Sequence, residues 1–527
     1  MILIHPPVAK SSEPPAGIAR LAGALDRHGI SHSVLDANLE GLLYIIERPK
    51  PKPGTSSDRW TSRAFRNVSG NYNSLRSRDT YLNIDRYKRA VIDLDHAIEK
   101  SFDSGVIIGL ANYKDPNLSP LRSADLIKAA EKPEINPFYP YFSKRLRDLI
   151  EKDGASAAGF SLNYLSQALC TFAMIGFIRR DFPGMKIILG GGLVTSWMNN
   201  PDWRNPFTGL VDTLIAGPGE QQLLSIMGID SANERHYTPA YDSLPLSNYL
   251  SPGQILPYSA SSGCYWNRCS FCPEKAEENP YIPLPVDRAI GDLNALIMKI
   301  RPSLVHLLDN AVSTALLKRL AGNPLGVPWY GFARVSSLLT DIDFCKALKQ
   351  SGCVMLKLGL ESGDQKVLDE MQKGIDLETA SLVLKTLKKA GISTYVYLLF
   401  GTPPETLTEA RNTLEFTVSH RDEIGFLNVA LFNMPVCGPG ISKYKTSSFY
   451  EGDLSLYTDF VHPKGWDRKQ VRQFLDNEFK RHPAVSEILQ KDPPVFTSNH
   501  APFFAMQHGR PLPDITQTAM DIKERQG

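Results

Sequence analysis

The sequence predicts an α/β chain with three parts: an open, doubly wound (Rossmann-like) domain, a six-stranded (βα)6 partial TIM barrel and a mainly helical C-terminal extension. Short apolar runs alternate with amphipathic helical segments, and glycine-rich turns follow several of these runs. A second series of six strand–helix units begins near residue 255 and stops after Cys437. We therefore place the three parts at residues 1–225, 250–437 and 438–527.

The first domain opens with a strand at residues 2–4, a helix over residues 17–28 that Gly29 closes, and a strand at residues 33–35. Strands that alternate with helices imply a parallel sheet, whose ligand binds at the carboxyl ends of the strands. Later elements of this domain are a strand at 157–160, a helix at 166–179, a strand at 186–189 that runs into Gly190-Gly191-Gly192, and a strand at 211–215 before Gly217-Pro218-Gly219-Glu220.

Residues 44–105 interrupt this pattern with a segment in which arginines and aromatic residues are interleaved. Such a mixture can bind nucleic acid, because bases stack on aromatic rings and phosphates pair with arginine. The other interpretation is a solvated insertion that covers part of the active site. Acidic residues soon dilute the positive charge of the segment, and we therefore favour the insertion.

The second series predicts the barrel, with Gly352 and Gly391 where helix C-caps belong. By the logic of complete eight-fold barrels, functional residues should gather at the carboxyl ends of the strands. The expected strands are 255–260, 304–308, 329–333, 354–359, 394–400 and 426–431, and the expected helices are 286–300, 313–321, 341–350, 376–390 and 405–418.

Composition excludes several classes of protein. The chain has 527 residues, of which 42% are hydrophobic and 22% charged, and a net charge of +2 gives no electrostatic case for a nucleic-acid or anionic-membrane partner. We find no apolar run long enough to span a bilayer and no signal-peptide pattern at the start. Seven cysteines, an odd number, do not suggest a disulfide framework. We expect a cytoplasmic protein with no membrane span.

Three of the seven cysteines, Cys264, Cys269 and Cys272, lie within nine residues directly after the first barrel strand. Three thiolates on one short loop can hold three corners of an iron–sulfur cube and leave one iron without a protein ligand. A closed zinc site would need a fourth ligand with knuckle-like spacing, and the sequence offers none nearby. The remaining alternative is a chance grouping of free or buried cysteines.

Together, the cysteine loop, the six strand–helix units and the preceding α/β domain resemble a radical S-adenosylmethionine (SAM) enzyme with an N-terminal cobalamin (B12)-binding domain. This class B-like pattern covers nearly the whole chain. The loop departs from it in one respect, because four residues rather than the usual three separate Cys264 from Cys269. The resemblance implies that Cys264, Cys269 and Cys272 hold a [4Fe–4S] cluster. SAM would chelate its open iron and be cleaved by one electron to a 5′-deoxyadenosyl radical.

The resemblance also implies a set of SAM-binding residues at the strand ends. Glu361 would accept hydrogen bonds from the ribose hydroxyls, Gly401 would let the backbone approach the adenine, and Arg334 would pair with the SAM carboxylate. The structural alternatives are a surface charge for Glu361, a plain turn for Gly401 and an ion pair for Arg334. Asp309 is assigned to the SAM amine or to a cobalamin ligand. The implied set is Phe271, Arg334, Gly359, Glu361, Ser362 and Gly401.

Cobalamin is implied in the same way, by loops of the first domain that are expected to surround the corrin. Glycines in these loops would let the backbone approach a flat macrocycle. The motif Asp-x-His-x-x-Gly, which supplies a cobalt-ligating histidine in many cobalamin proteins, is missing. The alternative is a degenerate domain that binds no cobalamin. The residues assigned to cobalamin are Pro7, Tyr164, Gly190, Gly191, Gly192, Gly217, Gly219 and Glu220.

From the resemblance we expect a cobalamin-dependent radical SAM methyltransferase that acts on a carbon centre of a small molecule or peptide. The alternative is a radical SAM cyclase or rearrangement enzyme of the same architecture without methyl transfer. A cluster-carrying regulatory or electron-transfer protein is disfavoured, because it needs no SAM pocket. We expect an external electron donor such as flavodoxin or ferredoxin and no nucleic-acid partner. The sequence assigns no catalytic residue.

Overall fold

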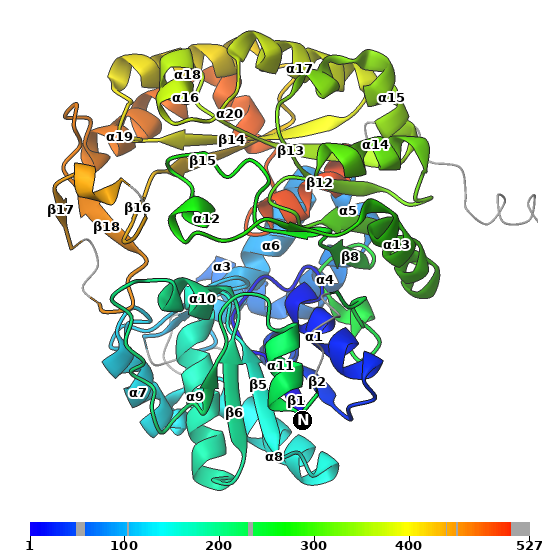
Figure 1. Ribbon diagram of the computed structural model, residues 1–527, viewed down its shortest axis with the longest axis vertical. Helices are drawn as coiled ribbons and strands as arrows, with labels where there is room; N and C mark the ends of the chain where they lie inside the picture. Colours follow the sequence, from blue (N-terminus) through cyan, green and yellow to red (C-terminus); the bar gives the residue numbers. More distant parts are fainter. Residues whose placement is uncertain (49–57, 103–104, 230–235, 439, 449–451, 507–527) are drawn as a thin grey trace, which may run out of the picture.

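The computed structural model describes residues 1–48, 58–102, 105–229, 236–438, 440–448 and 452–506 (Figure 1). Two parallel sheets organise these residues, one in the lower half of Figure 1 and one in the upper half. Among the described residues, no helix combines the length and apolar character needed to cross a bilayer.

The first sheet contains five parallel strands in the order β2-β1-β5-β6-β7. Numbered along the chain this order is 2-1-3-4-5, so the connections reverse direction between β1 and β5, and a doubly wound sheet binds its ligand beside such a reversal. The last strand is shorter than the expected residues 211–215. The bounds are β1 (Ile2–His5), β2 (Ser33–Asp36), β5 (Ala157–Ser161), β6 (Lys186–Gly190) and β7 (Thr213–Leu214).

Helices flank this sheet, and the longest of them is buried for most of its length. In α9 every residue from Gln167 to Ile178 is buried, as expected for a helix packed on more than one side. The helices next to the sheet are α1 (Ala16–Arg27), α2 (Ala37–Glu47), α8 (Tyr139–Asp153), α9 (Leu165–Asp181), α10 (Gly192–Met198) and α11 (Glu220–Ile226).

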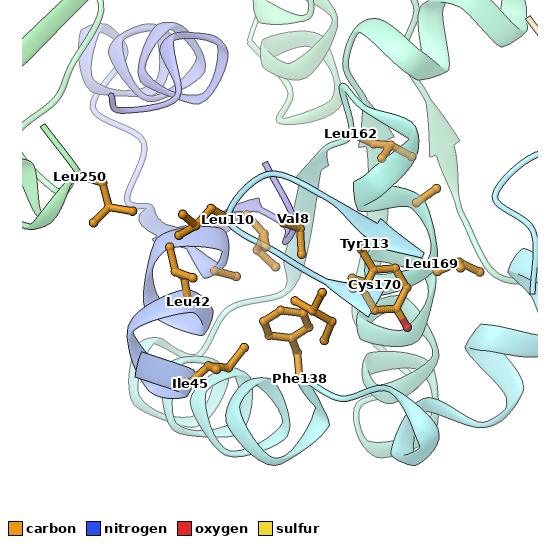
Figure 2. Packing of buried hydrophobic residues seen from close by; sticks show 14 of the residues in the cluster. Val8, Leu42, Ile45, Leu110, Tyr113, Phe138, Leu162, Leu169, Cys170 and Leu250 are labelled. Carbon is orange, nitrogen blue, oxygen red and sulfur yellow. The ribbon is translucent and has the colours of Figure 1, made fainter. Parts of the chain in front are cut away.

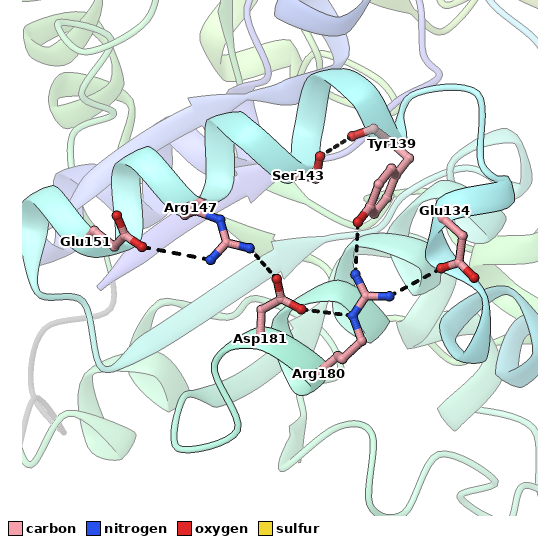
Figure 3. A network of polar contacts seen from close by, with 7 residues as sticks. All are labelled: Glu134, Tyr139, Ser143, Arg147, Glu151, Arg180 and Asp181. Carbon is pink, nitrogen blue, oxygen red and sulfur yellow. Dashed lines mark hydrogen bonds and ion pairs between the residues drawn. The ribbon is translucent and has the colours of Figure 1, made fainter.

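Figure 2 shows the core beside α9, where Tyr113 and Phe138 pack among aliphatic side chains and the Cys170 thiol is fully buried. At the end of α9 lies a polar network (Figure 3). Arg147 of α8 pairs with Asp181, and Arg180 pairs with both Asp181 and Glu134. These surface contacts connect α8 to α9 and add little stability individually.

The interruption of the first domain is longer and more ordered than the predicted 44–105 insertion, of which residues 49–57 and 103–104 lie outside the described part. It continues to residue 135, just before α8. The expectation of a merely solvated segment is wrong for α6, whose Tyr87 is fully buried. Its elements are α3 (Arg59–Arg66), α4 (Val68–Leu75), α5 (Arg78–Tyr81), α6 (Ile84–Glu99), β3 (Ile107–Ile108), β4 (Tyr113–Lys114), α7 (Ser123–Glu131) and η1 (Pro133–Ile135).

The second sheet confirms the predicted six parallel strands, in the order β15-β14-β13-β12-β11-β8. Helices follow the strands and cover the outer face of the sheet (Figure 1). The strands are β8 (Ile255–Tyr258), β11 (Leu304–Leu307), β12 (Trp329–Ala333), β13 (Cys353–Glu361), β14 (Ser393–Phe400) and β15 (Phe426–Leu431), and the helices are α13 (Val286–Ile300), α14 (Thr314–Gly322), α15 (Ile342–Gln350), α16 (Gln365–Glu370), α17 (Leu377–Ala390) and α18 (Leu407–Ser419).

The C-terminal extension is helical only in its second half. Before the helices, a three-stranded antiparallel sheet forms, which the prediction of a mainly helical segment missed. The elements are β16 (Met434–Pro435), β17 (Thr446–Ser447), β18 (Tyr457–Phe460), α19 (Arg468–Phe474), a π-helical turn η5 (Leu475–Phe479), α20 (Pro483–Gln490), η6 (Thr497–Asn499) and α21 (Ala501–Ala505).

Helix α21, the last described element of this extension, packs against α6 and β13. His500 is fully buried, and its Nδ1 lies 2.8 Å from the Tyr87 hydroxyl and 3.2 Å from the Tyr81 hydroxyl. Burial lowers the pKa of His500 to about 3. The insertion of the first domain and the end of the chain therefore share one core.

Candidate functional site

The three clustered cysteines lie on the segment between β8 and α13, which also carries β9 (Ser261–Ser262), α12 (Pro273–Ala276) and β10 (Ile282–Pro283). All three are free thiols. Cys269 is buried, whereas Cys264 and Cys272 are partly exposed. Burial raises the pKa of Cys269 and raises that of Cys272 to about 11.

Backbone geometry and one tryptophan hold this loop against the turn after α16 and the end of β12. Gly263 has φ +71°, and a Cβ there would lie 2.4 Å from the Pro280 carbonyl oxygen, so only glycine fits. Trp266 donates from Nε1 to the Gln372 carbonyl at 3.1 Å, and its ring lies 4.0 Å beneath the Arg334 guanidinium. The loop is therefore anchored before any cofactor binds.

The donor set fits a cluster better than a single ion. Within the described ranges, no three His, Cys, Asp or Glu side chains are gathered tightly enough to hold one metal ion. Zinc would bring its thiolates to within about 4 Å of one another. A cubane instead spreads three thiolates over three irons and leaves the fourth iron open. Cys264, Cys269 and Cys272 are the residues that would hold it.

Glu361 lies at the end of β13, where the strand register shifts, and forms an ion pair that the sequence did not reveal. Its Oε1 accepts from Lys373 Nζ at 2.8 Å, with the two side chains 14% and 10% exposed. Glu361 has φ +71°, which is strained for a residue with a Cβ. A Cβ on Gly359 would lie 2.6 Å from Glu361 Oε1, so glycine leaves room for the pair.

Phe271 and Arg334 lie beside this ion pair. Lys373 Nζ is 5.4 Å from the centre of the Phe271 ring, and Arg334 donates to the Lys373 carbonyl at 2.7 Å. Lys373 therefore connects three of the predicted SAM-binding residues. Only proximity in the fold identifies it, because it lies twelve residues after Glu361 and belongs to no motif.

Two other predicted residues serve the local structure of the strand ends. Ser362 is fully buried, and its hydroxyl lies 3.2 Å from Thr413 Oγ1 and accepts from the Asp364 N–H at 3.1 Å. Asp309 is buried, and its carboxylate accepts from the Ala260 N–H at 3.1 Å and from the Ser261 hydroxyl at 2.5 Å. Asp309 thereby fixes the start of the cysteine-bearing segment.

Gly401 lies on a loop that a buried carboxyl group holds together. Its φ is +80°, and its N–H donates to Glu405, which also accepts from Trp466 Nε1 at 3.1 Å. Burial raises the pKa of Glu405 to about 8. The Trp466 contact comes from the C-terminal extension, so that extension helps to shape the loop.

A cavity of about 570 Å³ lies between the first domain and the cysteine loop. The predicted residues Gly190, Gly191, Gly192, Gly217, Gly219 and Glu220 all line it, and Pro7 and Tyr164 do not. On the opposite wall, Ser262 and Gly263 precede the first cysteine and Pro273 follows the last. A ligand in this cavity would therefore lie next to the cysteine loop.

The glycine wall of the cavity depends on positions that exclude side chains. Gly191 has φ +111°, and a Cβ there would lie 2.4 Å from the Leu162 carbonyl oxygen. Two polar residues also belong to the wall. Arg20 pairs with Glu220 at 2.6 Å, and Asn163 Oδ1 accepts from the Gly192 N–H at 2.9 Å. Sequence reasoning missed Arg20, because it lies on a helix and belongs to no glycine turn.

Comparison with known proteins agrees with this geometry. Residues 258–417 match the model of the Radical SAM superfamily, and this part of the chain is a radical SAM domain. Such a domain implies SAM and a [4Fe–4S] cluster as cofactors.

Two curated relatives are named methyltransferases. An uncharacterized methyltransferase of Pyrococcus horikoshii is 28% identical over 190 residues, which is 34% of this chain and 40% of the relative. The cytidylyl-2-hydroxyethylphosphonate methyltransferase of Streptomyces wedmorensis is 24% identical over 168 residues, or 30% of this chain and 31% of the relative. The chain thus spans less than half the length of each relative.

The fold as a whole is similar to that of a solved enzyme. The radical S-adenosylmethionine methyltransferase TsrM from Kitasatospora setae, solved with its tryptophan substrate and a SAM analog, has a TM-score of 0.56 at 14% identity. The similarity covers 96% of this chain and 95% of that one. At this level of identity the similarity concerns the fold.

Proposed function

We propose that this chain is a cobalamin-dependent radical SAM methyltransferase acting on a carbon centre. The observation that carries the proposal is the position of the 570 Å³ cavity. Its glycine wall lies at the carboxyl ends of a doubly wound sheet, and its opposite wall flanks the cysteine loop. A corrinoid held by the first wall would face a cluster held by the second.

Each domain contributes binding groups of a different kind. Cys264, Cys269 and Cys272 would hold the cluster, and the Glu361–Lys373 pair with Phe271 and Arg334 would bind SAM. Gly190, Gly191, Gly192, Gly217, Gly219 and Glu220 would contact the corrinoid. The cofactors would supply the electron transfer, the radical and the methyl carrier, and the protein would position them and exclude water.

The names of relatives support methyl transfer to a small molecule. Two curated relatives are named methyltransferases, one of them for a hydroxyethylphosphonate, and the structural neighbour was solved with tryptophan. We therefore propose that the substrate is a small organic molecule that is methylated at a carbon atom. Reduction of the cluster would come from an external donor such as flavodoxin or ferredoxin.

Anaerobic reconstitution tests the proposal. The full-length protein is loaded with iron, sulfide and hydroxocobalamin, its absorption spectrum is recorded, and it is incubated with a reductant and SAM that carries a deuterated methyl group. We expect stoichiometric corrinoid, formation of 5′-deoxyadenosine, and deuterated methylcobalamin by mass spectrometry.

The possible outcomes separate the alternatives. A protein that forms 5′-deoxyadenosine but binds no corrinoid would be a radical SAM enzyme of another kind. Corrinoid binding without methyl loading would favour a cyclase or rearrangement enzyme of the same architecture. An intact cluster that never cleaves SAM would contradict the radical assignment itself.

A further inference from the structure

A lysine is buried inside the barrel, away from the cysteine loop. Lys357 lies on β13, two residues before Gly359 and four before Glu361, so all three side-chain positions share one face of the strand. The side chain is only 4% exposed. Its Nζ lies 2.8 Å from His306 Nε2 on β11.

A carboxylate from the first domain fixes the protonation of this histidine. Both oxygens of Glu13 lie within hydrogen-bond distance of His306 Nδ1, at 2.9 and 3.0 Å. An ammonium group only donates, so His306 Nε2 must accept from Lys357, and its Nδ1–H donates to Glu13. The Tyr330 ring stacks on the imidazole ring, with 4.2 Å between the ring centres, and fixes its orientation.

The Lys357 ammonium has more N–H groups than hydrogen-bond partners among the described residues. Within the part of the chain that the structure describes, its only hydrogen bond is the one to His306, although an ammonium has three N–H groups. The other neighbours are aromatic, with the ring centres of Phe332 and Tyr330 at 4.4 and 5.3 Å from Nζ. A buried charge with two unused donors is costly unless a ligand accepts from them.

Residues next to Lys357 on the barrel strands keep part of their surface exposed. Phe332, Gly359 and Tyr397 are partly exposed, whereas Lys357 is buried. Gly359 contributes no side chain to the space between Lys357 and Glu361. Four residues of a parallel strand span roughly 13 Å, which sets the distance from this floor to the barrel mouth.

We propose that Lys357, supported by His306 and Glu13, binds an anionic oxygen group of the substrate, a carboxylate or a phosphonate, at the floor of the barrel. This proposal rests on the proposed function and narrows its substrate class. The substrate is a small organic acid whose reacting carbon lies toward the mouth, about 10 Å from the bound oxygens. A duplex or a folded protein does not fit this site.

The charges around Lys357 are compatible with an incoming anion. The titratable groups that face it are His306 from β11, Tyr330 from β12, Tyr395 and Tyr397 from β14 and Glu13 from the first domain. Tyr395 donates from its hydroxyl to Asp492 of the C-terminal extension at 2.6 Å. Glu13 is separated from Lys357 by the imidazole ring, so an anion at Nζ is nearer to the ammonium than to the carboxylate. Burial lowers the pKa of Lys357 to about 8, and Glu13 opposes that shift.

Competitive acetylation of the reconstituted full-length protein tests the site. Trace acetic anhydride is applied across a pH series, and labelling of Lys357 is read by peptide mass spectrometry. The probes are sodium acetate and sodium methylphosphonate, with sodium chloride at equal ionic strength as reference. We expect Lys357 labelling with a midpoint near pH 8, and one probe should raise this midpoint and protect the residue several-fold. The probe with the larger effect identifies a carboxylate or a phosphonate.

Variants separate binding from folding. Lys357→Met should abolish the thermal stabilisation that the effective probe gives the wild type. Glu13→Gln should weaken probe binding roughly tenfold, because the ammonium loses its supporting charge. Lys349→Met removes a partly buried lysine on α15, outside the barrel, and should leave the probe effect intact.

Equal labelling of Lys357 in acetate, methylphosphonate and chloride would overturn the proposal, and so would probe stabilisation that survives in Lys357→Met. None of these measurements needs SAM cleavage or methyl transfer. Failure of the anion site is therefore distinguishable from failure of the proposed function, which the reconstitution experiment tests by itself.

Discussion

The cavity between the domains and the interior of the barrel are built in opposite ways. Backbone and glycine form much of the cavity wall, where Gly191 tolerates no Cβ beside Leu162. The barrel interior is instead lined by large side chains from separate strands, such as His306, Tyr330 and Lys357. The first region suits a broad, flat ligand, and the second suits a small one held by specific groups.

This difference suggests that the two regions bind different ligands. The cysteine loop lies between the two regions and contributes residues to the cavity wall, while Trp266 and Ser270 attach it to the turn after α16. A change on one side should therefore impair one cofactor and spare the other. The predictions below test that separation.

The largest effect is expected from the cysteines. Cys269→Ala should abolish the cluster and reductive SAM cleavage, because a cubane cannot keep its open iron with two protein ligands. Corrinoid binding should persist within about threefold, since its glycine wall belongs to the other domain and a single ligand change leaves that wall intact. Iron analysis, 5′-deoxyadenosine assays and corrinoid titration measure the three quantities.

Cys345→Ala provides the matched control. Cys345 is also buried, but it lies on α15 and its thiol contacts the Leu339 carbonyl at 3.4 Å. This variant should keep its iron and its SAM cleavage. If cleavage survives when Cys264, Cys269 and Cys272 are all replaced by Ala, the cluster assignment is wrong.

The opposite result, loss of corrinoid binding with SAM cleavage retained, is expected from a change in the glycine wall. In Gly192→Leu the new Cβ would have only Asn163 Oδ1 within 4 Å, at 3.7 Å, and leucine is more favourable than glycine in the first turn of α10. We expect stability near that of the wild type and corrinoid affinity lowered roughly tenfold or more, with 5′-deoxyadenosine formation retained. Equilibrium dialysis against hydroxocobalamin measures the loss.

Gly191→Ala distinguishes steric strain from lost binding. Its Cβ would collide with the Leu162 carbonyl at 2.4 Å, so the variant should lose about 1–3 kcal/mol of folding free energy even without corrinoid. Unchanged corrinoid affinity in Gly192→Leu would show that the cavity wall does not contact the cofactor.

A smaller effect is expected at the SAM side. Glu361→Gln keeps the shape of the side chain but leaves Lys373, only 10% exposed, without its carboxylate. SAM affinity should fall about tenfold, the usual consequence of losing a hydrogen bond to a charged group. Binding of labelled SAM to the reconstituted protein measures this. The control is Glu370→Gln, an exposed carboxylate at the end of α16, and an equal loss there would remove the special role of Glu361.

The same contrast explains what the sequence could predict. The six barrel strands and the glycine turns carry local patterns, alternating apolar runs and Gly-rich ends, and six of the eight residues assigned to cobalamin line the cavity. The resemblance also assigned Pro7 and Tyr164 to cobalamin, yet neither residue lines the cavity. Neither is a glycine, so no local requirement for a missing side chain marks these two positions.

Sequence patterns could not predict that the polar residues inside the barrel contact one another. Glu13 lies 293 positions before His306, and His306 lies 51 positions before Lys357, so these residues meet only in the folded chain. Lys373 was missed for the same reason, because a contact between a strand end and a turn has no spacing rule. The helical insertion and the extension likewise share a core at His500 that no local pattern reveals.

The smallest effect on the cofactors is expected at Glu405, as a change in pH dependence. Its pKa of about 8 in the folded chain exceeds the ordinary 4.5, so the folded state keeps a proton that the unfolded chain has released. Wild-type stability should therefore fall as pH rises from about 5 to 8, by at most about 4 kcal/mol from this group. Glu405→Gln, neutral at every pH, should show a shallower decline in denaturant unfolding at pH 6, 7 and 8. Parallel curves for the two proteins would mean that Glu405 is already ionised in the fold, and that the Gly401 loop is held by a charge rather than by a neutral carboxyl group.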